Sequence, residues 1–157
     1  MTGHTVLEIL QGPGKAAEEL RQSRERLEQI SAACLSTTAK YGSTGGGHTS
    51  NSGTGDGLSV LADAVSRVRA AEQALVQSEK AAQDLLDTLR RENETFMERD
   101  YMLLRMRYIL RLPWITVQDA LVRKGFRAST LRAVYKWHRR AIESAQHYMK
   151  EDINSEP

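Results

Sequence analysis

The chain has 157 residues, of which 40% are hydrophobic, 27% are charged and only 6% are aromatic, with a formal net charge of +2. This composition is rich in helix-forming residues and poor in the β-branched and aromatic runs that build sheets. No apolar run approaches the ~18 residues needed to cross a bilayer, the first residues carry no secretory signal, and the single Cys34 cannot form an internal disulfide, so a cytoplasmic protein is expected.

The small net charge hides a strong asymmetry along the chain. Residues 1–100 hold 11 Lys/Arg and 15 Asp/Glu, and residues 141–157 hold one Lys and four acids. Residues 101–140 hold 10 Lys/Arg and one acid, Asp119, which gives this block a net charge of +9. Such a localised positive field indicates a polyanionic partner, and the competing reading is a solvated basic surface without a ligand.

Residues 15–35 are predicted to form an amphipathic helix. Apolar or small residues recur there at alternating spacings of four and three, at Ala16, Leu20, Ser23, Leu27, Ile30 and Cys34. Pro13 and Gly14 separate this helix from a short apolar piece at 6–10, and the break is either a kink or a helix start.

Residues 36–57 are predicted to form a low-complexity loop, because seven glycines lie there among Ser, Thr and Asn. The loop lacks the Gly-Lys-Ser/Thr ending of a phosphate-binding P-loop, so no phosphate site is expected. His48 and Asp56 are not accompanied by a cluster of Cys or carboxylates, so no metal site is expected either.

Residues 58–95 are predicted to form a longer helix. Its apolar stripe follows an ordinary 3.6-residue period through Leu58, Leu61, Val65, Val68, Leu75, Ala82, Leu86 and Leu89. The stripe is expected to drift towards Ala71 and Leu85. Neither long helix can bury its stripe alone, so we expect the two to fold back on each other as an antiparallel hairpin, or two such hairpins to pair between chains. Because surplus apolar surface remains, a homo-oligomer is expected.

A third helix is predicted over 96–112 and a helix–turn–helix after it. Leu112-Pro113-Trp114 ends the third helix, since a residue before proline is pushed out of the helical region. Thr116 is predicted to cap the next helix, with Asp119 in the position of a capping-box acid, and Gly125 to end it in a left-handed conformation. Ser129 is predicted to cap the last helix, which runs to about His147.

The last helix has an apolar face and a basic face. Its apolar positions are Leu131, Val134, Tyr135, His138, Ala141, Ile142 and Ala145. A short helix, a glycine turn and a helix of this kind are the elements that enter the major groove of DNA. From helical phase, the residues expected near base edges are Thr130, Ala133, Lys136, Trp137 and Arg140, and those expected at the DNA backbone, beside the cap Ser129, are Arg127, Arg132 and Arg139.

Two alternatives stay open for this helix. A basic amphipathic helix is often only a surface helix, and Trp137 could pack on the hairpin instead of facing DNA. His138 falls on the apolar stripe, so it is interpreted as a core histidine with one hydrogen bond and not as a ligand or a base.

Three motifs carry a resemblance to a known family: Arg107-Tyr108-Ile109, then Trp114, then the segment from Val134 to Ile142. They resemble the C-terminus of the ArpU/RinA-like late transcriptional regulators of phages and prophages of Gram-positive bacteria. The resemblance implies a module similar to region four of bacterial sigma factors, which grips promoter DNA, and a role in phage transcription inside the host cytoplasm. The interval from Val117 to Val134 is two or three residues longer than in that family, and Val117-Gln118 replaces its usual Ile-Ala pair.

The predicted organisation is all-α: a long antiparallel, coiled-coil-like hairpin over 1–95 that oligomerises or binds a partner, a helix–turn–helix domain over 96–150, and a disordered acidic tail over 151–157. The leading functional hypothesis is a transcription regulator that binds double-stranded DNA. The alternatives are a small terminase-like DNA-packaging subunit and a module that binds bacterial RNA polymerase. No catalytic residues, cofactor, metal or membrane association are expected, because no nucleophile–base pair and no metal-ligand spacing occur.

Overall fold

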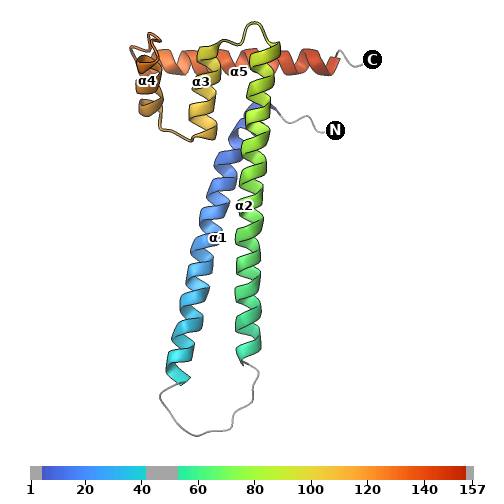
Figure 1. Ribbon diagram of the computed structural model, residues 1–157, viewed down its shortest axis with the longest axis vertical. Coiled ribbons are helices and arrows are strands. Elements are labelled where there is room, and N and C mark those ends of the chain that lie inside the picture. Colours follow the sequence, from blue (N-terminus) through green and yellow to red (C-terminus); the bar gives the residue numbers. More distant parts are fainter. Residues whose placement is uncertain (1–4, 42–52, 155–157) are drawn as a thin grey trace. The chain divides into compact units, whose positions relative to one another are not determined.

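The computed structural model describes residues 5–41 and 53–154, and these residues form helices and connections with no strand (Figure 1). The all-α prediction is confirmed. The chain divides into two compact units, which we name the terminal unit (Met1–Lys15 and Val76–Pro157) and the central unit (Ala16–Leu75). The helices are α1 (Val6–Tyr41), α2 (Gly53–Glu92), α3 (Glu98–Leu104), α4 (Trp114–Arg123) and α5 (Leu131–Asn154), with a π-helix (Arg105–Ile109) after α3.

α1 begins earlier than predicted and does not break at Pro13. Its start is a capping box, in which the Thr5 hydroxyl accepts the Glu8 N–H at 3.3 Å and the Glu8 carboxylate accepts the Thr5 N–H at 2.8 Å. Pro13 lies inside the helix and is buried. Its missing N–H costs one backbone hydrogen bond, and burial of the ring with neighbouring apolar side chains offsets part of that loss. The prediction of a separate apolar piece at 6–10 is therefore wrong.

The predicted loop over 36–57 is too long. α1 continues to Tyr41 and α2 begins at Gly53, so helical backbone occupies both ends of that range. Residues 42–52, with His48, lie outside the described residues, as does the side chain of Asp56. The expected absence of a phosphate or metal site there stays a prediction.

In the central unit, α1 and α2 run antiparallel. The Arg24 guanidinium pairs with the Glu72 carboxylate at 2.9 Å, and the Cys34 thiol lies 4.0 Å from the Gly57 carbonyl oxygen. The predicted stripe of α1 faces this seam, but the stripe of α2 is partly wrong, because Leu58 is 69% exposed. Ala71, towards which the stripe is predicted to drift, is buried, and so is Ala64, which the prediction did not include.

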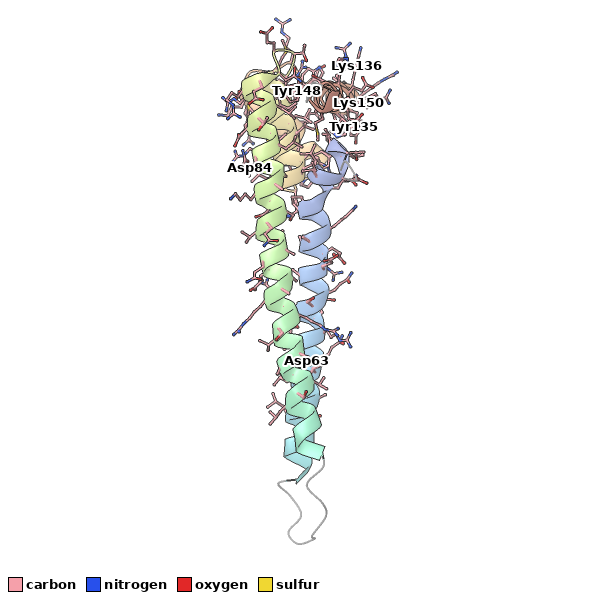
Figure 2. All side chains as sticks on the ribbon, turned by 90° about the vertical axis from the view of Figure 1, so that its right-hand side faces the viewer. Asp63, Asp84, Tyr135, Lys136, Tyr148 and Lys150 are labelled. Carbon is pink, nitrogen blue, oxygen red and sulfur yellow. The ribbon has the colours of Figure 1, made fainter. Side chains whose placement is uncertain are left out.

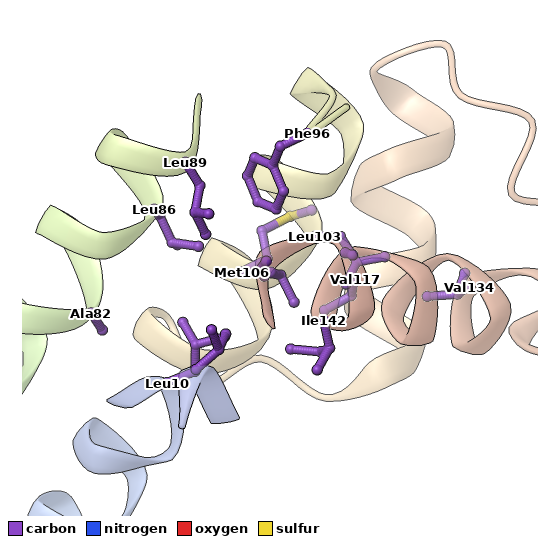
Figure 3. Close-up of a cluster of buried hydrophobic side chains, with 14 of the residues drawn as sticks. Leu10, Ala82, Leu86, Leu89, Phe96, Leu103, Met106, Val117, Val134 and Ile142 are labelled. Carbon is purple, nitrogen blue, oxygen red and sulfur yellow. The ribbon is translucent and has the colours of Figure 1, made fainter. Parts of the chain in front are cut away.

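The terminal unit holds the larger apolar core, to which α1, α2 and all the C-terminal helices contribute (Figure 3). Its buried side chains are Val6, Leu10, Ala82, Leu86, Leu89, Phe96, Leu103, Leu104, Met106, Val117, Leu121, Ala128, Val134, Ala141, Ile142 and Ala145. The last turns of α2 thus belong with α3, α4 and α5.

The third helix is shorter and less regular than the predicted 96–112. α3 starts after Met97, whose N–H is accepted by the buried Asp100 carboxylate at 3.4 Å. After Leu104 the backbone widens into the π-helix, with the Leu110 N–H bonded to the Arg105 carbonyl at 3.0 Å. Arg111 then adopts a left-handed φ of 54°, which ends the helix two residues before Pro113.

Candidate nucleic-acid interface

α4 is the first helix of a helix–turn–helix and begins at Trp114, three residues before the predicted start. Pro113 is its N-cap, in extended conformation with ψ 150°, and no side chain caps the helix. The prediction that Thr116 caps it with Asp119 is therefore wrong, since the proline's fixed φ already starts the helix. Val117 and Leu121 are fully buried and form the inner face of this helix.

The turn after α4 has the geometry of a Schellman motif. Gly125 has a φ of +89°, its N–H bonds the Val122 carbonyl at 2.9 Å, and the Phe126 N–H bonds the Leu121 carbonyl at 3.0 Å. The prediction for Gly125 is confirmed, and Phe126 is partly buried against the core. The Gln118 side-chain amide donates to the Ala128 carbonyl at 2.9 Å and fixes the turn against α4.

α5 starts one residue later than predicted, and Thr130 caps it. The Thr130 hydroxyl accepts the Ala133 N–H at 3.2 Å, so the predicted cap at Ser129 is wrong. The helix continues beyond the predicted His147 to Asn154. Its predicted apolar face is buried at Val134, Ala141, Ile142 and Ala145 and half-buried at Leu131 and His138. Tyr135 is 45% exposed and meets the Trp114 ring edge-on at 5.1 Å between ring centroids.

His138 joins α5 to the π-helix. The one hydrogen bond predicted for it is present, and its ring is half-buried. Its Nε2 lies 2.8 Å from the Tyr108 hydroxyl, and its ring meets Trp114 edge-on. Burial, together with the nearby Arg107 cation, lowers the pKa of His138 below its usual value. Burial also raises the pKa of Tyr108, so both groups are neutral at pH 7.

Arg107 and Arg99 hold the two tryptophans of this module. The Arg107 guanidinium lies over Trp114, 4.8 Å from the ring centroid, and donates to the Leu112 carbonyl at 3.0 Å. The Arg99 guanidinium lies over Trp137 at 4.6 Å and pairs with the buried Asp100 carboxylate at 2.9 Å. These cations therefore brace α5 and the start of α4 from inside the unit.

The outer face of the helix–turn–helix carries seven cations that have no partner among the described residues. All seven are exposed: Arg123, Lys124, Arg127, Arg132, Lys136, Arg139 and Arg140. Most arginines elsewhere in the terminal unit are paired, for example Arg90 with Glu98 and Arg111 with Glu79. Figure 1 shows α4 beside the first turns of α5, and Figure 2 labels Tyr135 and Lys136 on α5.

The predicted site residues occupy different environments. Six of them are exposed side chains at or after the turn without a partner: Arg127, Ser129, Arg132, Lys136, Arg139 and Arg140. Thr130 is exposed but caps α5, Ala133 is half-buried, and Trp137 is half-buried against the core beneath Arg99. The DNA contacts assigned to these residues stay predictions.

The predicted site residues, chosen from the helical phase of α5, did not include two cations of this surface. Arg123 and Lys124 end α4 directly before Gly125, and both side chains are exposed and unpaired. The sequence signal for them was a basic pair directly before the turn glycine. Residues that flank the turn lie near the start of α5 and can therefore share its surface.

No protein-family model, curated protein or solved structure matches the chain. Within residues 5–41 and 53–154, no helix is long and apolar enough to span a bilayer, and no three His, Cys, Asp or Glu side chains gather as a metal site would require.

Proposed function

We propose that this chain is a phage-type transcription regulator that binds promoter DNA through α4, its turn and α5. One observation carries the proposal: seven exposed cations without partners cover a helix–turn–helix. Unpaired cations on a surface repel one another, and DNA phosphates relieve that repulsion while condensed counterions are released. The sequence resemblance to ArpU/RinA-like regulators supplies the phage role, and the cytoplasm of a bacterial host is then the place of action.

The arrangement of α5 supports major-groove entry. Its apolar face is committed to the core, and its outward face presents Arg132, Lys136, Arg139 and Arg140 over about two and a half turns. Arginine and lysine can bond guanine O6 and N7 as well as phosphate, so this face can supply both sequence readout and affinity. The Arg99 and His138 contacts keep α5 in place, which limits the ordering cost of binding.

The test is fluorescence anisotropy of the full chain with labelled duplexes from the DNA that flanks its gene, at 50 and 200 mM salt. We expect affinity to fall about 10²–10⁴-fold between the two salt concentrations, as several phosphate contacts require. Lys136→Ala with Arg140→Ala should weaken binding and flatten the salt slope by about one to two. Arg69→Ala with Lys80→Ala, which removes two exposed, unpaired cations from α2, is the matched control and should leave binding unchanged.

Three outcomes would contradict the proposal. Absent or salt-indifferent binding rejects a DNA interface. Equal affinity for flanking and unrelated duplexes, together with rings of eight or more chains, favours the packaging subunit. Capture of bacterial RNA polymerase without any DNA affinity favours the polymerase-binding module.

A further inference from the structure

The central unit has an open groove between α1 and α2 of about 510 Å³. Its floor consists of Ser23 and four alanines, Ala64, Ala70, Ala71 and Ala74. Glu19, Gln22 and Arg26 from α1 and Arg67 from α2 rim it. Small floor residues allow the backbone of another helix to approach closely, as helix packing at short interaxial distances requires.

The helices beside this groove bury little by themselves. Of the described side chains of the central unit, Ala16, Leu20, Ala64 and Ala71 alone are buried. Larger apolar residues at the seam, such as Leu27, stay half-exposed. Two helices with so small a core cannot offset the entropy of ordering long side chains and backbone, so further burial is needed for a stable bundle.

The charges on the rim lack partners in the chain itself. Neither Glu19, Arg26 nor Arg67 makes an ion pair or side-chain hydrogen bond with any described residue. Their neighbours on the other faces do: Arg21 pairs with Glu18 and Glu25, and Arg24 pairs with Glu72. The groove therefore presents an acidic end and, seven residues along α1, an end flanked by two arginines.

We propose that a second copy of this chain docks in this groove by an antiparallel, twofold pairing centred near Gln22 and Ser23. A spacing of seven residues is close to two helical turns, so Glu19 and Arg26 lie on one face about 10.5 Å apart. A twofold axis midway between them brings Arg26 to Glu19 of the partner subunit, and the same contact recurs on the other side. Arg67 flanks the same position and adds to the attraction.

Self-complementarity selects a second copy over an unrelated partner. One end of the groove is negative and the other is positive. When two identical grooves are related by a twofold axis, the negative end of each meets the positive end of the other. The alanine floor then packs against itself, and four helices enclose the half-exposed seam residues. This inference concerns association of chains alone and is measured without DNA, so its failure and failure of the DNA interface are distinguishable.

The test is the solution mass of the full chain, by sedimentation across micromolar concentrations. We expect a dimer, and we expect Glu19→Arg or Arg26→Glu to raise its dissociation constant about tenfold, because each removes two symmetric ion pairs and creates two like-charge contacts. The double variant, Glu19→Arg with Arg26→Glu, restores the pairing and should recover the affinity. Glu28→Arg, an exposed and unpaired residue that does not line the groove, is the matched control.

A crosslinking arm tests the register. In a Cys34→Ser background, Gln22→Cys lies near the twofold axis and should form an intermolecular disulfide on mild oxidation, whereas Glu28→Cys should not. Circular dichroism checks that every variant remains helical. A monomer at all concentrations, a dimer that ignores both charge reversals, or a double variant as weak as the singles would overturn the proposal.

Discussion

Acidification should destabilise the terminal unit through His138. In the folded chain its imidazole is half-buried between the Tyr108 hydroxyl and the Trp114 ring, and the Arg107 cation lies nearby. A protonated ring there would bring a second positive charge into a poorly hydrated site, which lowers the folded pKa. Below about pH 6.5 the unfolded chain therefore binds more protons than the folded one, and the free energy of unfolding decreases as pH falls from 6.5.

The hydrogen bond between Tyr108 and neutral His138 has a geometry from which its contribution to stability follows. A 2.8 Å hydrogen bond between half-buried groups contributes about 1 kcal/mol, so Tyr108→Phe should lower the urea midpoint by about 0.3–1 M at pH 7.5. The assay is urea unfolding followed by tryptophan fluorescence. The chain's two tryptophans, Trp114 and Trp137, both lie in the terminal unit, so the signal reports that unit.

Substitution of His138 separates titration from packing. His138→Gln should lower stability at pH 7.5 and remove most of the loss between pH 6.5 and 5. His147→Gln is the control, because that side chain is exposed, and its pH profile should match the unaltered chain. Stability that is flat from pH 7.5 to 5 in the unaltered chain, or a pH dependence that survives His138→Gln, would refute the reasoning.

Three further substitutions test the module's local structure, each by urea unfolding with tryptophan fluorescence. Gly125→Ala should cost about 1–2 kcal/mol, because a φ of +89° strains any L-residue even though no atom lies within 4 Å of the added Cβ; an unchanged midpoint would mean that the turn relaxes freely. Thr130→Ala should cost about 0.5–2 kcal/mol, and Ser129→Ala close to nothing, which tests the corrected cap. Arg99→Ala should destabilise the unit by about 1–3 kcal/mol, since it leaves the buried Asp100 carboxylate without its ion pair, and a neutral effect would contradict that role.

The C-terminal helices were largely predictable because their apolar faces are complete. The α5 stripe falls on one face with a period of 3.6, and only one position of it is substantially exposed, Tyr135. Gly125 was predicted because the left-handed residue that ends a helix is usually glycine. Local rules of this kind depend on neighbours in sequence, and they hold where tertiary packing agrees with them.

The rest depended on contacts that sequence periodicity does not contain. Ala64 is buried because α1 approaches closely there, and alanine carries little hydrophobic signal by itself. The π-helix and the left-handed Arg111 lie where Met106 and Tyr108 pack into the core. Pro113 predicted the end of the helix but neither of these two features. The cations of the candidate interface differ from most other arginines of the terminal unit because they lack an ion pair. Sequence alone could not predict which cations are paired, because several of the partners lie on other helices.

The division of the terminal unit between the two ends of the chain has a consequence for its synthesis. Val6 and Leu10 share their core with Leu86 near the end of α2 and with Ile142 on α5. A ribosome that adds about 5–20 residues per second needs roughly seven to thirty seconds to reach Ile142. During that interval the first turns of α1 leave the ribosome without the core they belong to, so chaperone occupancy of nascent chains should be highest before α5 emerges. An early stop codon within α5 would therefore also leave Val6 and Leu10, at the start of α1, without part of their core.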